Sequence, residues 1–181
     1  MGLKIKLGIF YTVYILRYSW YRLFYDDKAV EIFVERCSHP RIALKIIGVK
    51  VGKYCRIHNG LTLYNFKKQH LQIGDNVHIG KSVFLDLTDK ISIHNNCTIS
   101  MGSKILTHMD VGDSDLKVNY PKKTGAITLE ENVYIGAQSL VLYTAEVIKS
   151  RTLLASNSTL VKRTKPSSMY AGNPAIFKST I

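Results

Sequence analysis

The stretch IGDNVHIGKSVFLDLTDKI, residues 73–91, decides the fold, because its aliphatic residues recur every six positions. Each unit is roughly an aliphatic residue, a glycine or other small residue, two polar residues, a small residue or valine, and one variable residue. A period of two is typical of alternating strands, and a period of 3.6 is typical of a helix. A period of six fits neither alone. It predicts a short strand followed by a turn, with the aliphatic side chain pointing inward.

Units of the same kind occur at residues 51–57 and 93–105 and, after a gap, at 129–153. The repeating apolar positions are Ile93, Ile99 and Ile105 before the gap and Leu129, Ile135, Val141, Val147 and Leu153 after it. Three units make one triangular coil of about 18 residues, and stacked coils satisfy each other's backbone hydrogen bonds, as in other solenoids. Residues 58–72 do not keep the strict period, and the phase at Leu153 or Leu154 is open by one residue.

Charge is distributed unevenly along the 181 residues, whose net charge is +12. Residues 1–56 hold 11 Lys and Arg against four Asp and Glu, residues 57–148 hold eight against nine, and residues 149–181 hold six against none. Basic ends attract phosphate-bearing partners or serve only solubility. No nucleic-acid-binding motif accompanies the charge, so we expect no nucleic acid partner. Three widely spaced cysteines, an odd number without a CxxC pair, predict a reducing compartment without disulfides.

The N-terminus has the pattern of a basic, aromatic helix. Residues 7–16 are uncharged but too short for a bilayer, which needs about 20 residues. Ile9, Val13, Leu16, Trp20 and Leu23 recur at helical spacing. Two interpretations stand side by side: peripheral membrane contact through residues 1–25, or packing against the chain's own domain or a sister subunit. A second short helix is expected from about residue 28 to 37, ended by the SHP sequence at 38–40.

The repeats resemble those of the hexapeptide-repeat acyltransferases, closest in pattern to the maltose/galactoside-type and polysaccharide O-acetyltransferases. The resemblance covers residues 49–177 and is strongest in ITLEENVYIGAQSLVL (127–142) and MYAGNPAIF (169–177). It implies an all-β fold, a left-handed parallel β-helix with an N-terminal helical segment and a loop extruded after His108. The expected divisions are the helical segment at 1–48, the β-helix at 49–165 and a C-terminal tail with the GNPA signature at 166–181.

The gap at residues 107–126 is the expected site of function, because loops on rigid scaffolds commonly carry it. The sequence ILTHMD (105–110) matches the family's exit from the coil, so the resemblance implies that His108 is a general base. An imidazole can take a hydroxyl proton at neutral pH and return it to a leaving thiolate. Asp86 and Asp110 are the candidates for orienting the ring.

The resemblance also implies acetyl-CoA as donor, bound between two subunits of a homotrimer. Gly136 and Ala137 would contact the pantetheine arm, and Lys162, Arg163 and Lys178 would face the phosphates. The zinc site of gamma-class carbonic anhydrases, which share this β-helix, needs a histidine partner that His108 lacks, so no metal is expected.

We therefore expect a cytoplasmic enzyme, at the inner membrane face if the N-terminus binds lipid. It would O-acetylate a sugar, or a lipid-linked oligosaccharide, in capsule, exopolysaccharide or O-antigen synthesis. Three alternatives stay open: N-acetylation of a nucleotide-linked amino sugar, acetylation of a streptogramin-type antibiotic, and a non-catalytic β-helical scaffold.

Overall fold

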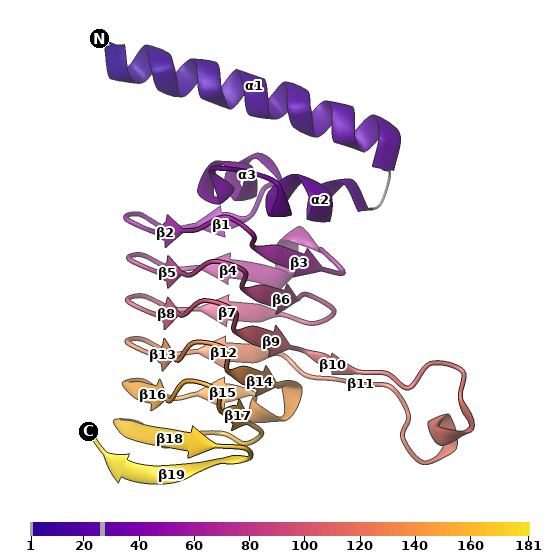
Figure 1. Ribbon diagram of the computed structural model, residues 1–181, viewed down its shortest axis with the longest axis vertical. Coiled ribbons are helices and arrows are strands. Elements are labelled where there is room, and N and C mark those ends of the chain that lie inside the picture. Colours follow the sequence, from indigo (N-terminus) through magenta and orange to yellow (C-terminus); the bar gives the residue numbers. More distant parts are fainter. Residues whose placement is uncertain (1, 26–27) are drawn as a thin grey trace.

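The computed structural model describes residues 2–25 and 28–181, with side chains from residue 11 on. Short strands wind around a stack of coils, so that three parallel faces run the length of the molecule (Figure 1). The first face consists of β1 (Lys50–Val51), β4 (Leu71–Ile73), β7 (Ile91–Ile93), β12 (Ile127–Leu129) and β15 (Val147–Ile148). The third face consists of β3 (Thr62–Tyr64), β6 (Phe84–Asp86), β9 (Lys104–Leu106), β14 (Leu140–Leu142) and β17 (Thr159–Leu160).

The second face is the longest, because a hairpin at the C-terminal end extends it. It consists of β2 (Arg56–Ile57), β5 (His78–Ile79), β8 (Thr98–Ile99), β13 (Tyr134–Ile135), β16 (Thr152–Leu154), β18 (Ser168–Gly172) and the antiparallel β19 (Ala175–Thr180). Short 3-10 turns occur at η2 (Lys68–His70), η3 (Asp115–Val118) and η4 (Tyr143–Ala145). The predicted fold, a left-handed parallel β-helix with helices at its N-terminal end, is confirmed.

The hexapeptide positions form the core, as the period of six predicts. The residues from Ile93 to Ile105 and from Leu129 to Val141 that carry the repeat are at most 1% exposed. Burial of one such side chain is worth roughly 1.5–3 kcal/mol, so the column of aliphatic residues is the main stabilising element of each coil.

The predicted repeat position Val147 is wrong by one residue, and the open choice between Leu153 and Leu154 is decided in favour of Leu154. Leu129 pairs with Ile148 and Ile135 with Leu154, and Ile148 and Leu154 are fully buried. The turn η4 adds one residue to its corner, and Glu146 there has a positive φ of 49°. Corners also lengthen the earlier coils beyond the expected 18 residues, since Lys50 pairs with Gln72 and Leu71 with Ile91.

Three helices cover the N-terminal end of the solenoid (Figure 1). The expected second helix is α2 (Ala29–Glu35). Another helix, α3 (Pro40–Ile46), was not expected. It begins at Pro40, the proline expected to end the preceding helix, because proline is favoured in the first turn of a helix. Both helices pack against the first coil, and Phe33, Val34 and Leu44 are completely buried there.

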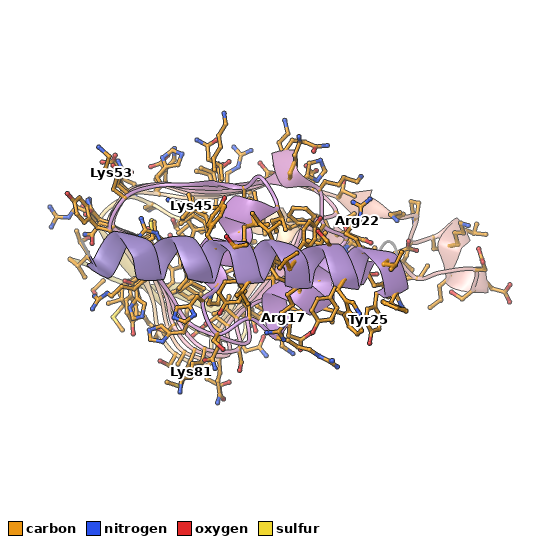
Figure 2. All side chains as sticks on the ribbon, turned by 90° about the horizontal axis from the view of Figure 1, so that it is seen from above. Arg17, Arg22, Tyr25, Lys45, Lys53 and Lys81 are labelled. Carbon is orange, nitrogen blue, oxygen red and sulfur yellow. The ribbon has the colours of Figure 1, made fainter. Side chains whose placement is uncertain are left out.

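The first helix, α1 (Gly2–Tyr25), lies across the other two helices (Figures 1 and 2). Its Tyr14 and Tyr21 rings contact Phe33, with ring centroids 6.4 and 6.3 Å apart. Within the described residues no helix is long and apolar enough to cross a membrane. The side chain of Ile9, which the sequence placed on this helix, lies outside the part that the structure describes.

Candidate active site

The excursion predicted at residues 107–126 leaves the coil directly after β9. It forms a short hairpin from β10 (His108–Met109) and β11 (Lys123–Thr124), in which His108 pairs with Thr124. The ladder then continues as if nothing had intervened, since Ile127 pairs with Ile91 in the coil above. The break in the repeat is therefore a side excursion from one corner, and the coil closes around it.

Thr107 fixes both ends of this excursion. Its buried hydroxyl donates to the Asp86 carbonyl at 2.8 Å and accepts the Asp89 N–H at 3.0 Å. The Thr107 carbonyl accepts the N–H of Gly125, where the chain returns, at 2.9 Å. The corner that carries His108 is thus held to the coil above it and to the far end of its own loop.

Asp86, in the coil above, contacts His108 and is fully buried. Its Oδ2 accepts the backbone N–H groups of Thr107 and His108 at 2.8 and 3.1 Å and lies 2.5 Å from His108 Nδ1. Its Oδ1 accepts the N–H and the hydroxyl of Thr88 at 3.0 and 2.7 Å. Burial raises the pKa of this carboxyl, but the hydrogen bonds from Thr88, His108 and Thr107 outweigh it and the net pKa is lowered. Asp86 is therefore a carboxylate at neutral pH.

His108 is oriented by this carboxylate. In the neutral ring, a carboxylate at Nδ1 places the proton there and leaves the lone pair on Nε2. The Thr88 hydroxyl lies 3.2 Å from the same Nδ1 and accepts a hydrogen bond from the Asn65 amide at 2.9 Å. The Tyr64 ring stacks on the imidazole at 5.8 Å with an interplanar angle of 8°. The His108 side chain is 21% exposed, so a substrate can reach it.

The other candidate carboxylate, Asp110, lies apart from the imidazole nitrogens. It accepts the Gly112 N–H at 2.9 Å and pairs with Lys122 at 3.1 Å, and these contacts lower its pKa. In the part of the chain that the structure describes, no hydrogen bond joins Asp110 to His108. The structure thus brings Asp86 to the histidine and uses Asp110 to close the base of the loop.

Two of the predicted cationic residues follow β17 at the same corner as His108. Val141 pairs with Ile105 above and with Leu160 below, so Lys162 and Arg163 follow two coils further along the solenoid. Arg163 forms an ion pair with Glu146, and Lys162 is exposed.

A hollow of about 450 Å³ lies along this corner, beginning at the register partner of His108. It is lined by Thr124, Gly125, Ala126, Thr128, Tyr143, Thr144, Glu146 and Val147. The sequence singled out only Val147 among them, and only as a repeat position. The repeat pattern could have indicated this position. Leu142 pairs with Leu106, so the turn η4 lies at the same corner as Thr107, one coil further along.

The remaining predicted residues lie on the second face or at its edge. A Cβ at Gly136 would lie 2.4 Å from the Ser156 nitrogen, so this glycine lets neighbouring coils approach. Ala137 lines a separate hollow of about 430 Å³ with His58, His78 and Tyr134. Lys178 is exposed on β19. In a single chain these residues and His108 therefore belong to different corners.

The described residues contain no cluster of three His, Cys, Asp or Glu that could hold a metal. His58 and His78 form a ring contact at 5.1 Å, without a third ligand from the described chain. The three cysteines are buried and free, and burial raises the pKa of Cys97 to about 11. A thiol with so high a pKa is a poor nucleophile or metal ligand at neutral pH.

Comparison with known proteins identifies the repeat and the fold. Residues 71–106 match the hexapeptide repeat of succinyl-transferase. A hexapeptide-repeat-containing acetyltransferase from Vibrio cholerae superposes with a TM-score of 0.74 at 18% identity, covering 83% of this chain and 86% of that one. A galactoside acetyltransferase in complex with coenzyme A gives 0.67 at 16% identity over 90% and 82%.

An N-acyltransferase from Bacillus cereus, in complex with dTDP and coenzyme A, gives a TM-score of 0.61 at 21% identity, covering 76% of this chain and 87% of that one. None of the curated proteins matches the sequence. The chain is thus a hexapeptide-repeat protein with the left-handed β-helix of the hexapeptide-repeat acetyltransferases. At these identities the likeness establishes the fold, and the chemistry has to be argued from this chain's own residues.

Proposed function

We propose that the protein is an acetyl-CoA-dependent O-acetyltransferase that acts on a sugar hydroxyl. The observation that carries the proposal is the contact between the buried Asp86 carboxylate and His108 Nδ1 at 2.5 Å. This contact leaves the lone pair of His108 on Nε2, where it can act as a base. The side chain is partly exposed and lies where the extruded loop leaves the coil. Acetyl-CoA would lie along this corner, because a hollow with both polar and apolar walls follows His108 there, and the cationic Lys162 follows two coils further along.

In the proposed reaction, His108 Nε2 takes the proton of the acceptor hydroxyl. The oxygen attacks the thioester carbonyl, a C–O bond forms, and the C–S bond breaks. The imidazolium then returns its proton to the leaving thiolate, giving the acetyl ester and free coenzyme A. Asp86 stabilises the charge that the ring carries between these steps, as a carboxylate does in a triad. Tyr64, stacked on the ring, restricts its rotation.

The homotrimer predicted from the sequence is part of the proposal. His108 and Ala137 lie at different corners, so one elongated donor can contact both only if it lies between the corner of one subunit and the second face of the next. We propose this arrangement in the cytoplasm, where acetyl-CoA is available, with capsule, exopolysaccharide or O-antigen sugars as the acceptor class.

The test is thiol release from acetyl-CoA with a panel of sugars, nucleotide sugars and amino sugars, comparing the wild type with His108→Asn. We expect acceptor-dependent release that falls by at least 100-fold in the variant, which is the usual size of a general-base contribution. Turnover that the variant retains would refute the role of His108. Absence of both turnover and coenzyme A binding would favour the scaffold.

One comparison favours a second candidate, N-acylation of a nucleotide-linked amino sugar. The Bacillus cereus neighbour is an N-acyltransferase whose crystals contain dTDP and coenzyme A. The same panel separates the two, because an amide product resists mild alkaline hydroxylamine and an ester product does not. Turnover with amino sugars alone, giving an alkali-stable product, would replace O-acetylation by this candidate.

A further inference from the structure

Over residues 11–25, the helix α1 has one packed face and one face that no other described residue covers. On the packed face, Tyr14 and Tyr21 are 7% and 6% exposed, and the Tyr14 hydroxyl is hydrogen-bonded to His39 Nδ1 at 2.8 Å. Arg17 donates to the Tyr21 hydroxyl at 3.3 Å. The bond from Tyr14 to His39 and the contacts of both tyrosine rings with Phe33 fix the helix, and therefore its other face, relative to the solenoid.

The uncovered face is an apolar stripe. It consists of Val13, Leu16, Trp20, Leu23 and Phe24, which are 53–78% exposed. Their spacing of three and four residues places them on one side of the helix, away from the two buried tyrosines. The Trp20 and Phe24 rings are in contact, with centroids 4.8 Å apart. A contiguous patch of large, solvent-exposed apolar side chains marks an interaction site.

Cations border this stripe, and no acidic residue occurs in α1. Figure 2 shows α1 from above, with Arg17 and Arg22 labelled on opposite sides of the helix. Lys28 and Lys45 are exposed in the neighbouring segments. An apolar stripe with Trp, Phe and Leu, flanked by Lys and Arg, has the composition of helices that lie in the headgroup region of anionic membranes.

A second copy of the chain is a poorer occupant for electrostatic reasons. If two stripes packed together, the arginines of one α1 would face those of the other, and neither helix carries an acidic residue to neutralise them. Anionic lipid headgroups supply the complementary charge, each basic residue near such a surface being worth about a fivefold increase in binding.

We propose that α1 binds the surface of an anionic bilayer, with the apolar stripe inserted at the headgroup level and the arginines at the phosphates. Because α1 lies across the end of the coil stack (Figure 1), the solenoid would stand upright on the membrane, and the extruded hairpin would project parallel to it. The proposal is independent of acetyl transfer, because it uses none of the residues assigned to that reaction.

Trp20 is the only tryptophan of the chain, so its fluorescence reports on the stripe alone. The full-length protein is mixed with vesicles of phosphatidylcholine, with or without phosphatidylglycerol, and followed by emission maximum and co-sedimentation. We expect a blue shift and at least tenfold tighter binding to the anionic vesicles, reduced by salt. The double variant Leu16→Gln, Leu23→Gln keeps good helix formers in place and should bind at least tenfold more weakly.

Leu116→Gln, the same change at a 55% exposed leucine of the extruded loop, is the matched control and should bind like the wild type. Circular dichroism establishes that both variants are folded. Wild-type protein that neither shifts nor sediments with vesicles would overturn the proposal, as would a double variant that binds equally well. If the double variant instead lowers the oligomeric state in lipid-free solution, the stripe is a subunit interface. Acetyl transfer to a free sugar, measured on the same preparations, is scored separately.

Discussion

Asp86→Asn probes the hydrogen-bond network under His108 most directly, because every acceptor position of this carboxylate is occupied. Its Oδ2 faces two backbone N–H groups, and its Oδ1 faces the N–H and the hydroxyl of Thr88. An asparagine places an NH2 group at one of the two positions. At the Oδ2 position this group would oppose two N–H donors. At the Oδ1 position it opposes one, since the Thr88 hydroxyl can turn to accept.

The amide nitrogen should therefore take the Oδ1 position, and its oxygen should remain at His108 Nδ1. One partly buried backbone donor, the Thr88 N–H, then loses its acceptor, which costs about 1–3 kcal/mol of unfolding free energy. The tautomer of His108 is kept, but its partner is now neutral. The difference between a charged and a neutral hydrogen bond, about 1–2 kcal/mol, lowers kcat by about 5- to 30-fold.

The assay combines urea unfolding with steady-state acetyl transfer. Asp89→Asn is the control, because Asp89 lies on the same corner and its carboxylate bonds only the next N–H, that of Lys90, among the described residues. A loss of about 10,000-fold in Asp86→Asn, the size seen when a triad histidine takes the wrong tautomer, would refute the reasoning about the amide orientation. An unchanged kcat would refute the role of the Asp86 charge, and a larger effect in Asp110→Asn would assign the orienting role to the loop.

Three further predictions concern stability and the donor. The pKa of Asp86 is lowered in the folded protein. Its contribution to stability is therefore present above pH ~4, the pKa of an unfolded aspartate, and is lost as the pH falls through the lower pKa of the folded state. Between pH 7 and pH 3, the free energy of urea unfolding should fall less in Asp86→Asn than in the wild type. Gly136→Ala should lower the unfolding free energy by about 3 kcal/mol or more through overpacking, because its Cβ would lie 2.4 Å from a backbone nitrogen. Gly112→Ala has open space around its Cβ but a φ of +65°, so it should cost only about 1–2 kcal/mol; equal losses in thermal melts would contradict the close approach. Lys162→Gln should raise KM for acetyl-CoA about 5- to 10-fold with little change in kcat, and Lys90→Gln should not, so a fall in kcat alone would exclude a binding role.

The sequence predicts the solenoid well because each buried aliphatic residue belongs to a local period. It places Ile99 and Ile135 in the core, and these pair in the structure although the extruded loop separates them. The period fails where a corner gains a residue without a sequence signal, as at η4, where Ile148 replaces Val147 in the core. It also could not show α3, since Pro40 is a signal both for the end of one helix and for the start of another.

The candidate site was only half predictable for the same reason. His108 stands out because it lies at the interruption of the period, which is a local feature. The choice between Asp86 and Asp110 depends on which residue lies across the ladder, and a spacing of 22 residues is ambiguous when coils vary in length. The α1 pattern was equally open, because helical spacing shows that a stripe exists but not which of two stripes is buried. The structure buries the tyrosine face and leaves the Leu16 face exposed.

The neck of the extruded loop has a consequence for evolution. The pairing of His108 with Thr124 and the hydrogen bond from Gly125 to Thr107 close the hairpin at its base. A change in the loop beyond this neck therefore leaves the backbone of the coil in place. Closing a flexible loop of twice the length costs only about 0.6 kcal/mol more. We therefore expect the segment from residue 111 to 121 to be exchangeable: it can be lengthened, shortened or transplanted between chains that share this neck, while the coil and the contact of Asp86 with His108 stay as they are.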